Sequence, residues 1–291
     1  MSIFESVFKL SKEVLENAKD VTIDYDYIND KGKDLILATD LPITKLQIDT
    51  KEIRKLILKE LTLDSINYCY WYGSCNFRFN NAGATKASEL LNNSFIDYSR
   101  SDPACDDFSV CIDKFKHELL ENRFPLLEER FRHLNEVEIN GESFADAIFL
   151  YREEKVTFDF IVENMLWYFP GFASDLFLKR AALFFINLYR VAGLFEKNLS
   201  QLPVAADYQL PKVLEYYGFI KYSEELKNII NKEILIPKGS RFEIEIRAAT
   251  VLACQKLCEV TNLNIAQIDI FFWGSRNITK TPFHLCATTD Y

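Results

Sequence analysis

The chain has 291 residues, of which 48% are hydrophobic, and its formal net charge is −9. This composition excludes a disordered chain, and the acidic balance disfavours a protein that grips a nucleic-acid duplex. The N-terminal residues lack the uninterrupted apolar run of a secretory signal, and no apolar stretch is long enough to cross a bilayer. With seven cysteines in no framework spacing, we therefore expect free thiols, a cytoplasmic protein and no membrane partner.

The N-terminal part of the sequence predicts two helices and a small antiparallel β element. Apolar side chains at helical spacing predict helices over 4–19 and 53–61. The segments 21–28 and 35–38 flank an Asn-Asp-Lys-Gly turn, which is typical of a β-hairpin. An aromatic block follows at 67–79, and the polar stretch 80–107 is predicted to be flexible.

The sequence from residue 108 onward is predicted to be mainly helical. One helix is expected over 158–168, ending before Pro170-Gly171, and a buried one starts with Asp175 as its N-cap and runs to about Ala192. Ser240 and Glu243 form a capping-box pattern at the start of a long helix, and a last helix is expected over 265–273. The predicted fold class is mainly α with a small antiparallel β element. We expect an N-terminal lobe at 1–119 packed against a helical catalytic lobe at 120–291.

Two positions break local rules in the C-terminal half. Lys179 and Arg180 are expected about one turn inside the predicted buried helix, near its start, where the helix dipole favours anions. Two cations at a helix N-terminus describe an anion site, and cations that extend to solvent are an equally good explanation. Asp207 follows two alanines and lies upstream of the cap expected before Pro211. It is a candidate acid, base or electrostatic stabiliser, although an Asx turn or a solvated loop aspartate is the commoner role.

Several other side chains are weaker candidates for a binding site. Glu243 and Arg247 have the spacing of an exposed ion pair, which leaves Glu245 unexplained. His284 could line a pocket, and Trp71 and Trp273 could stack on a planar base, although core packing is the usual role of such residues. The sequence lacks the glycine-rich phosphate loops and the nucleophile elbow, and three histidines are too few for a histidine-rich metal site.

Taken together, the motifs resemble the queuosine salvage family, the queuosine 5′-phosphate N-glycosidases. The segment from Ala206 to Leu214, ADYQLPKVL, is similar to that family's ADYxLPxxL signature. Further matches follow the family's order: Pro125–Arg130 with Leu134–Glu136, Phe169-Pro170, Lys179–Ala181, Phe219–Leu226, Glu243–Arg247, Trp273 and Pro282–His284. Upstream, only Asn67-Tyr68 and Tyr70-Trp71 resemble a family motif, and Gly274 stands where the family often has aspartate.

The resemblance implies an enzyme that hydrolyses the N-glycosidic bond of queuosine 5′-monophosphate to queuine and ribose 5-phosphate. It implies a helical core related to helix-hairpin-helix DNA glycosylases, no cofactor or metal, and a small-molecule nucleotide as partner. Asp207 becomes the catalytic carboxylate and Lys179, with Arg180, the ligand of the 5′-phosphate. The remaining expected substrate contacts are Tyr208, Glu245, Arg247, Trp71, Trp273 and His284. A non-catalytic binding protein of the same fold and a glycosidase for another nucleotide remain alternatives, and a DNA glycosylase is disfavoured by the acidic charge.

Overall fold

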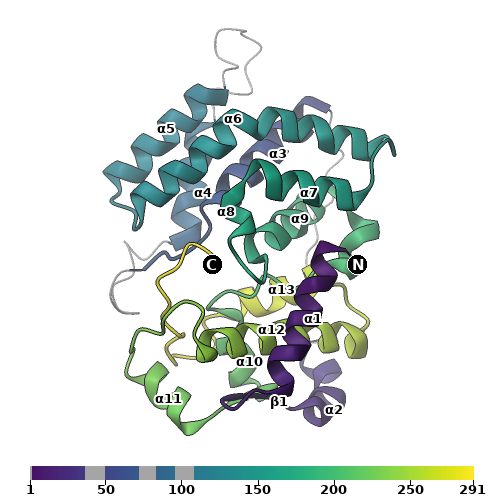
Figure 1. Ribbon diagram of the computed structural model, residues 1–291, viewed down its shortest axis with the longest axis vertical. Coiled ribbons are helices and arrows are strands. Elements are labelled where there is room, and N and C mark those ends of the chain that lie inside the picture. The colour runs from purple at the N-terminus through teal and green to yellow at the C-terminus, as the bar shows by residue number, and fades with distance from the viewer. Residues whose placement is uncertain (1, 37–49, 72–82, 96–107) are drawn as a thin grey trace. The chain divides into compact units, whose positions relative to one another are not determined.

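A computed structural model describes residues 2–36, 50–71, 83–95 and 108–291. Within these ranges the chain is mainly helical and carries one two-stranded antiparallel sheet, as predicted (Figure 1). The contacts divide the described chain into two units, one formed by 2–36, 176–289 and Tyr291, and the other by the described parts of 50–175 with Asp290. These boundaries differ from the expected division at residues 119 and 120. No helix in the described ranges combines the length and the apolar character that a membrane crossing requires.

The first unit is built around one long helix. α12 (Arg241–Thr261) is buried along most of its length and contacts α1, α2, α10, α13 and the sheet. Ala248, Ala249 and Ala253 are fully buried in it, because small side chains let several neighbouring elements approach the same helix. The other elements of the unit are α1 (Ile3–Glu16), β1 (Val21–Ile23), α2 (Tyr25–Ile36), α9 (Lys179–Ala192), the 3-10 helix η3 (Glu196–Gln201), α10 (Leu210–Tyr216), β2 (Ile220–Tyr222), α11 (Glu224–Asn231) and α13 (Ile265–Gly274).

The predicted hairpin near the N-terminus is wrong. β1 pairs with β2, so that Val21 lies opposite Tyr222, and the chain after β1 turns into α2 (Figure 1). Asp24 begins this helix by accepting a hydrogen bond from the N–H of Tyr27 at 2.9 Å. Gly32, expected in a turn, lies inside α2, where a Cβ would stand 2.9 Å from Leu257 of α12. The glycine is there for close helix packing, which the turn interpretation did not consider.

The second unit holds the remaining described helices. They are α3 (Thr50–Ser65), α4 (Gly83–Ser94), α5 (Phe108–Glu121), α6 (Leu127–Arg152), α7 (Phe158–Tyr168) and the short α8 (Pro170–Ala173). α4 lies within the stretch 80–107 that the sequence predicted to be flexible, so that prediction is wrong for 83–94. The structure also describes Phe95 of that stretch. Residues 80–82 and 96–107, and residues 72–79 of the aromatic block, lie outside the described residues. α7 ends at Tyr168 before Pro170, as predicted.

A buried arginine organises the start of α6. The Arg130 side chain is fully buried, and its guanidinium lies 4.5 Å from the ring centre of Tyr68 and 4.9 Å from that of Tyr70. Its nitrogens donate hydrogen bonds to four backbone carbonyls, those of Pro125, Ile66, Tyr68 and Cys69. A guanidinium presents five donors in a fixed plane, so it can join these separate segments where a lysine could not.

Replacement of Arg130 by alanine is therefore expected to destabilise the second unit. Four carbonyls would lose a charged donor, and a buried acceptor without a partner costs about 1–3 kcal/mol. We expect the free energy of unfolding, measured by urea denaturation, to fall by about 3 kcal/mol or more. Arg132→Ala, at an exposed position of the same helix, is the matched control. Equal stability of the two variants would contradict the role given to Arg130.

Candidate active site

The site is built on the segment that precedes α10. Ala205 and Ala206 are buried, and Asp207 follows them with part of its side chain accessible to solvent. The Asp207 Oδ1 accepts hydrogen bonds from the backbone N–H groups of Gln209 at 2.7 Å and Leu210 at 3.1 Å. Asp207 therefore forms an Asx turn into the helix, the structural role that the sequence left open beside the catalytic one.

The electrostatic environment of Asp207 combines poor solvation with nearby cations. Burial raises the pKa of the Asp207 carboxyl above its ordinary value, whereas Lys179, the two backbone N–H groups and Arg247 lower it. The residue as a whole is partly exposed, but its carboxyl is poorly hydrated and lies within electrostatic range of Lys179 and Arg247. These are the conditions under which a carboxylate acts strongly on a developing cation, because little water screens it.

Lys179 and Arg180 begin the helix α9 rather than lying one turn inside it. Asp175 was expected to cap this helix, but the residue before α9 is Leu178, which has a positive φ of 51° and offers no side-chain hydrogen bond to the helix. Both cations are buried, with 3% of Lys179 and 1% of Arg180 exposed. Extension into solvent is therefore excluded for both. A helix start with no side-chain cap and two buried cations retains the features of an anion site.

Arg247 fixes the residue before Asp207. Its Nε donates a hydrogen bond to the carbonyl of Ala206 at 3.1 Å, and its Nη1 pairs with Glu243 at 3.4 Å. The spacing of this pair was predicted, but its exposure was not, because both side chains are buried. The guanidinium lies 4.6 Å from the ring centre of Phe177 and 4.3 Å from that of Tyr291. Arg247 thus positions the Asp207 segment from a closely packed aromatic setting.

Glu243 departs from the predicted capping box. Ser240 caps α12 by accepting from the N–H of Glu243, as expected. The Glu243 carboxylate, however, accepts from the N–H of Gly239 at 3.1 Å and also faces Arg247. It therefore links the start of α12 to the arginine that holds Ala206.

Glu245 is occupied by the N-terminal segment of the same unit. Its carboxylate accepts hydrogen bonds from the backbone N–H groups of Lys19, Asp20 and Val21, at 2.7 to 3.2 Å. It also lies 3.8 Å from Arg241. These contacts hold the start of β1 against α12 and favour a structural role over contact with a substrate base.

The aromatic and histidine candidates are distributed around the site. Tyr208 packs against Phe283, with ring centres 4.4 Å apart. His284 is buried and its Nε2 lies 3.1 Å from the Tyr291 hydroxyl. Burial, together with the charge of Arg247, lowers the pKa of His284 to about 3, so this histidine is neutral at physiological pH. It supports the C-terminal residues that pack on Arg247.

The two tryptophans have different surroundings. Trp273, at the end of α13, is 38% exposed, and the guanidinium of Arg276 lies 3.6 Å from its ring centre. Trp71 is buried in the second unit. A contact of either ring with a substrate base stays a prediction.

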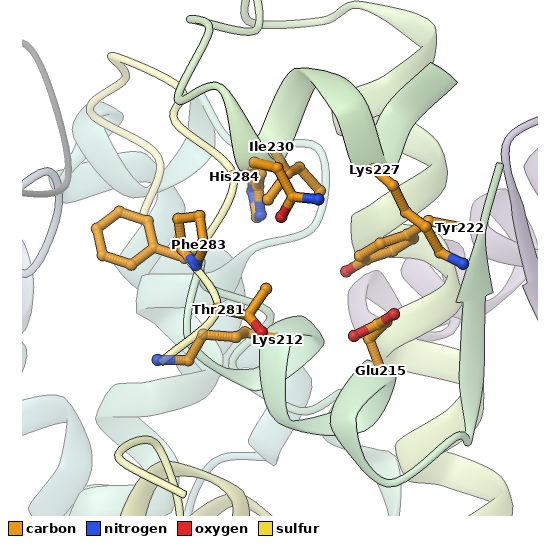
Figure 2. A pocket seen from close by; sticks show the side chains of 10 residues that line it. Lys212, Glu215, Tyr222, Lys227, Ile230, Thr281, Phe283 and His284 are labelled. Carbon is orange, nitrogen blue, oxygen red and sulfur yellow. The ribbon is translucent and has the colours of Figure 1, made fainter. Parts of the chain in front are cut away.

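A pocket of about 270 Å³ lies next to this group of residues in the first unit. Figure 2 shows Glu215, Tyr222 and Lys227 together on one side of it and Phe283 and His284 on the other. Phe283 lines this pocket and also packs on Tyr208, whereas Asp207 is not among the lining residues. The pocket is therefore adjacent to the Asp207 segment but separate from its carboxyl.

One carboxyl of the site was missed from the sequence. Asp269 of α13 is 4% exposed and lies close enough to Asp207, Lys179 and Arg190 for their charges to interact. The available signal was an aspartate in the apolar run IAQIDIFFW, where an acidic residue has no place on a packed face. Within the described ranges, no group of three or more His, Cys, Asp or Glu side chains is arranged to hold a metal ion.

The structure is that of a helical protein in which a poorly hydrated aspartate lies within electrostatic range of a buried lysine at the start of a helix. The model of the family described as queuosine salvage protein matches residues 49–289. The chain therefore belongs to the queuosine salvage protein family.

Curated relatives match over most of the chain. A protein of Sphaerobacter thermophilus is 28% identical, over 98% of this chain and 97% of its own length. A Dictyostelium discoideum protein is 30% identical, over 77% and 74% respectively, and one from Mus musculus is 27% identical, over 93% and 94%. All three are named queuosine 5′-phosphate N-glycosylase/hydrolase.

Proposed function

We propose that the protein hydrolyses the N-glycosidic bond of queuosine 5′-monophosphate and releases queuine and ribose 5-phosphate. The observation that carries this proposal is the placement of Lys179 within electrostatic range of Asp207, at the uncapped start of α9. A cleavage site for a nucleoside monophosphate needs a carboxylate near the anomeric carbon and a cation for the phosphate. The names of the relatives agree with this substrate.

Asp207 is assigned the central chemical role. As the C1′–N9 bond breaks, its electron pair passes to the base and positive charge develops on the ribosyl ring. The Asp207 carboxylate stabilises this oxocarbenium-like centre and orients the water that adds to C1′. The Asx turn leaves the second oxygen, Oδ2, for these contacts, because the backbone hydrogen bonds from Gln209 and Leu210 both go to Oδ1.

The chemistry of the departing base, queuine, limits how the protein can assist cleavage of the N-glycosidic bond. Queuine is a 7-deazaguanine, which has carbon at position 7, so protonation at that position is not available as it is for guanine. Negative charge on the departing base must be managed at its pyrimidine edge, and the ribosyl side must supply more of the stabilisation. This requirement fits a strongly acting, poorly hydrated carboxylate such as Asp207.

The phosphate is assigned to the start of α9. Lys179 supplies a positive charge and Arg180 a second one, and the backbone N–H groups of the first helical turn add hydrogen-bond donors. The same lysine lowers the pKa of Asp207 and so favours its ionised form. Lys179 is therefore assigned two roles, because it binds the 5′-phosphate and also keeps the carboxyl of Asp207 ionised.

The fold of the core belongs to the same proposal. The order of α7, the short α8, α9 and the downstream Asp207 resembles the order of elements in helix-hairpin-helix DNA glycosylases. Superposition of an experimental structure on such a glycosylase, with Asp207 matched to its catalytic aspartate, would test the relationship.

The experiment for the function is incubation of the purified chain with queuosine 5′-monophosphate, with free queuine detected by mass spectrometry. We expect stoichiometric release of queuine and ribose 5-phosphate. Tight binding without product would instead favour a non-catalytic binding protein, and release of a different base from another nucleotide would change the substrate.

A further inference from the structure

The side chain of Gln209 carries a buried polar atom without a partner. Its carboxamide oxygen, Oε1, is shielded from solvent and has no hydrogen-bond partner among the described residues. A buried acceptor that makes no hydrogen bond costs free energy, and such atoms are few in folded proteins, so each one calls for an explanation. A bound molecule that donates a proton to this oxygen would supply one.

The helix that follows Gln209 does not use its side chain. Gln209 is the residue before α10, a position at which a side-chain oxygen can accept from a backbone N–H of the first turn. The Gln209 side chain makes no such hydrogen bond, and the N–H of Leu210 donates to Asp207 instead. The Asx turn of Asp207 therefore takes the place of a cap, and the carboxamide of Gln209 has no part in starting the helix.

The backbone of Gln209 is tied to the proposed catalytic carboxylate. Its N–H donates a hydrogen bond to Asp207 Oδ1 at 2.7 Å, which fixes the two residues relative to each other. In the proposed reaction the other carboxylate oxygen, Oδ2, faces C1′ of the ribose. We therefore look for the partner of the Gln209 side chain among the substrate groups closest to C1′.

The ribose 2′-hydroxyl is the hydrogen-bond donor closest to C1′ that a carboxamide can bind. The ring oxygen and N9 of the base, which are bonded to C1′, have no proton to donate. The N–H groups on the pyrimidine edge of the base lie further from C1′ than the hydroxyl on C2′ does. A hydroxyl can donate to the amide oxygen and also accept from the amide nitrogen, so it suits both atoms of the carboxamide.

We propose that the carboxamide of Gln209 binds the ribose 2′-hydroxyl and selects a ribonucleotide over a 2′-deoxyribonucleotide. The proposal rests on the proposed hydrolysis and adds a specificity-determining residue to it. The 2′-hydroxyl withdraws electrons from C1′ and so opposes the positive charge that develops there. Donation of its proton to Oε1 raises the electron density on the 2′-oxygen, so this hydrogen bond strengthens in the transition state.

The kinetic test uses queuosine 5′-monophosphate and its 2′-deoxy analogue with the full chain. Gln209→Leu removes the carboxamide at similar volume, whereas Gln209→Glu keeps an acceptor oxygen. The ratio of kcat/KM for the two nucleotides is compared between proteins, because the intrinsic effect of the missing hydroxyl on bond cleavage is common to all of them and cancels. Gln255→Leu is the matched control, since Gln255 is a partly buried glutamine on α12 of the same unit.

We expect Gln209→Leu to lower the ratio of ribonucleotide to deoxyribonucleotide about tenfold below that of the wild type, mainly through a lower kcat for queuosine 5′-monophosphate. Gln209→Glu is expected to keep the wild-type ratio within about threefold, and Gln255→Leu to keep both the rates and the ratio. A wild-type ratio in Gln209→Leu, or a tenfold loss of the ratio in Gln209→Glu, would overturn the proposal.

Thermal unfolding distinguishes a substrate contact from a structural role. Because Oε1 has no partner in the free protein, leucine at position 209 removes no hydrogen bond from the fold and relieves a buried acceptor. The Tm of Gln209→Leu should therefore equal or exceed that of the wild type. A Tm more than about 4 °C lower would show that the carboxamide serves the fold, and would contradict the proposal.

Binding of sugar phosphates separates failure of this proposal from failure of the proposed function. Calorimetric titration with ribose 5-phosphate and 2-deoxyribose 5-phosphate requires no turnover. We expect the wild type to bind ribose 5-phosphate about fivefold or more tightly than the deoxy sugar, and Gln209→Leu to bind the two equally. If the wild type releases no queuine, the hydrolysis fails while this comparison still decides the role of Gln209. Equal affinity of that protein for both sugars, or binding of neither, would then overturn the proposal as well.

Discussion

Replacement of Asp207 by asparagine is expected to reduce queuine release from queuosine 5′-monophosphate by about a thousandfold or more. The substitution removes the negative charge that stabilises the ribosyl cation, and it retains a side-chain oxygen that can accept from the N–H groups of Gln209 and Leu210. The Asx turn should therefore survive, and the loss should appear in kcat rather than in folding. Steady-state kinetics and thermal unfolding of the same preparation measure the two effects.

Two further variants make the Asp207 result interpretable. Asp207→Ala removes the Asx turn together with the charge, so it should lose stability as well as activity. Asp20→Asn neutralises a buried carboxyl elsewhere in the same unit and should leave kcat unchanged. If the folded Asp207→Asn protein still turned over at a tenth of the wild-type rate, the carboxylate would have no central part in the reaction.

Replacement of Lys179 by alanine is expected to lower kcat/KM for the nucleotide by about fiftyfold, and for the nucleoside queuosine only severalfold. A hydrogen bond to a charged group contributes about 1.5–3 kcal/mol, which is lost only with the substrate that carries the phosphate. The smaller loss is common to both substrates, because Lys179 also favours the ionised form of Asp207. The ratio of the two kcat/KM values is therefore the decisive quantity.

The matched control for Lys179 is Lys221→Ala. Lys221 lies on β2 in the same unit, is exposed, and pairs with Asp24 at 2.6 Å. The Lys221→Ala variant should therefore keep the wild-type kcat/KM for both the nucleotide and the nucleoside. Equal losses on nucleotide and nucleoside in Lys179→Ala would remove the lysine from phosphate binding and leave it only an electrostatic role toward Asp207.

The helices that the sequence predicted well are those whose signals are local. The apolar spacing of residues 4–19 corresponds to α1, and Ser240 caps α12 with its side chain as predicted. Each of these signals is contained within a few neighbouring residues. They could therefore be read without knowledge of the rest of the fold.

The errors share a different cause, which is contact between distant parts of the chain. β1 has its partner at 220–222, which no turn signal near the N-terminus could reveal. The start of α9 is set by the positive φ of Leu178, although Asp175 is by type the better capping residue. The Glu243–Arg247 pair was found by its spacing, but its burial depends on Phe177 and Tyr291.

The candidate site was only partly accessible from the residues themselves. Asp207 and Lys179 were unusual in their local sequence. Before the family resemblance was considered, an Asx turn or a solvated loop aspartate was the commoner explanation for Asp207, and solvated cations were an equally good explanation for Lys179. The structure adds their electrostatic proximity, and it brings the buried carboxyl of Asp269 within electrostatic range of both. An aspartate inside an apolar helix is the kind of conflict that marks a functional position, and it was visible in the sequence.

The most direct measurement of the whole account is a single-turnover reaction of queuosine 5′-monophosphate with excess enzyme, in which free queuine is quantified over time. The wild type should convert the nucleotide completely to queuine and ribose 5-phosphate, while Asp207→Asn, folded and at the same concentration, should form no queuine in that interval. Equal queuine formation by both proteins, or an intact nucleotide after incubation with the wild type, would contradict the assignment of glycosidic cleavage to this carboxylate.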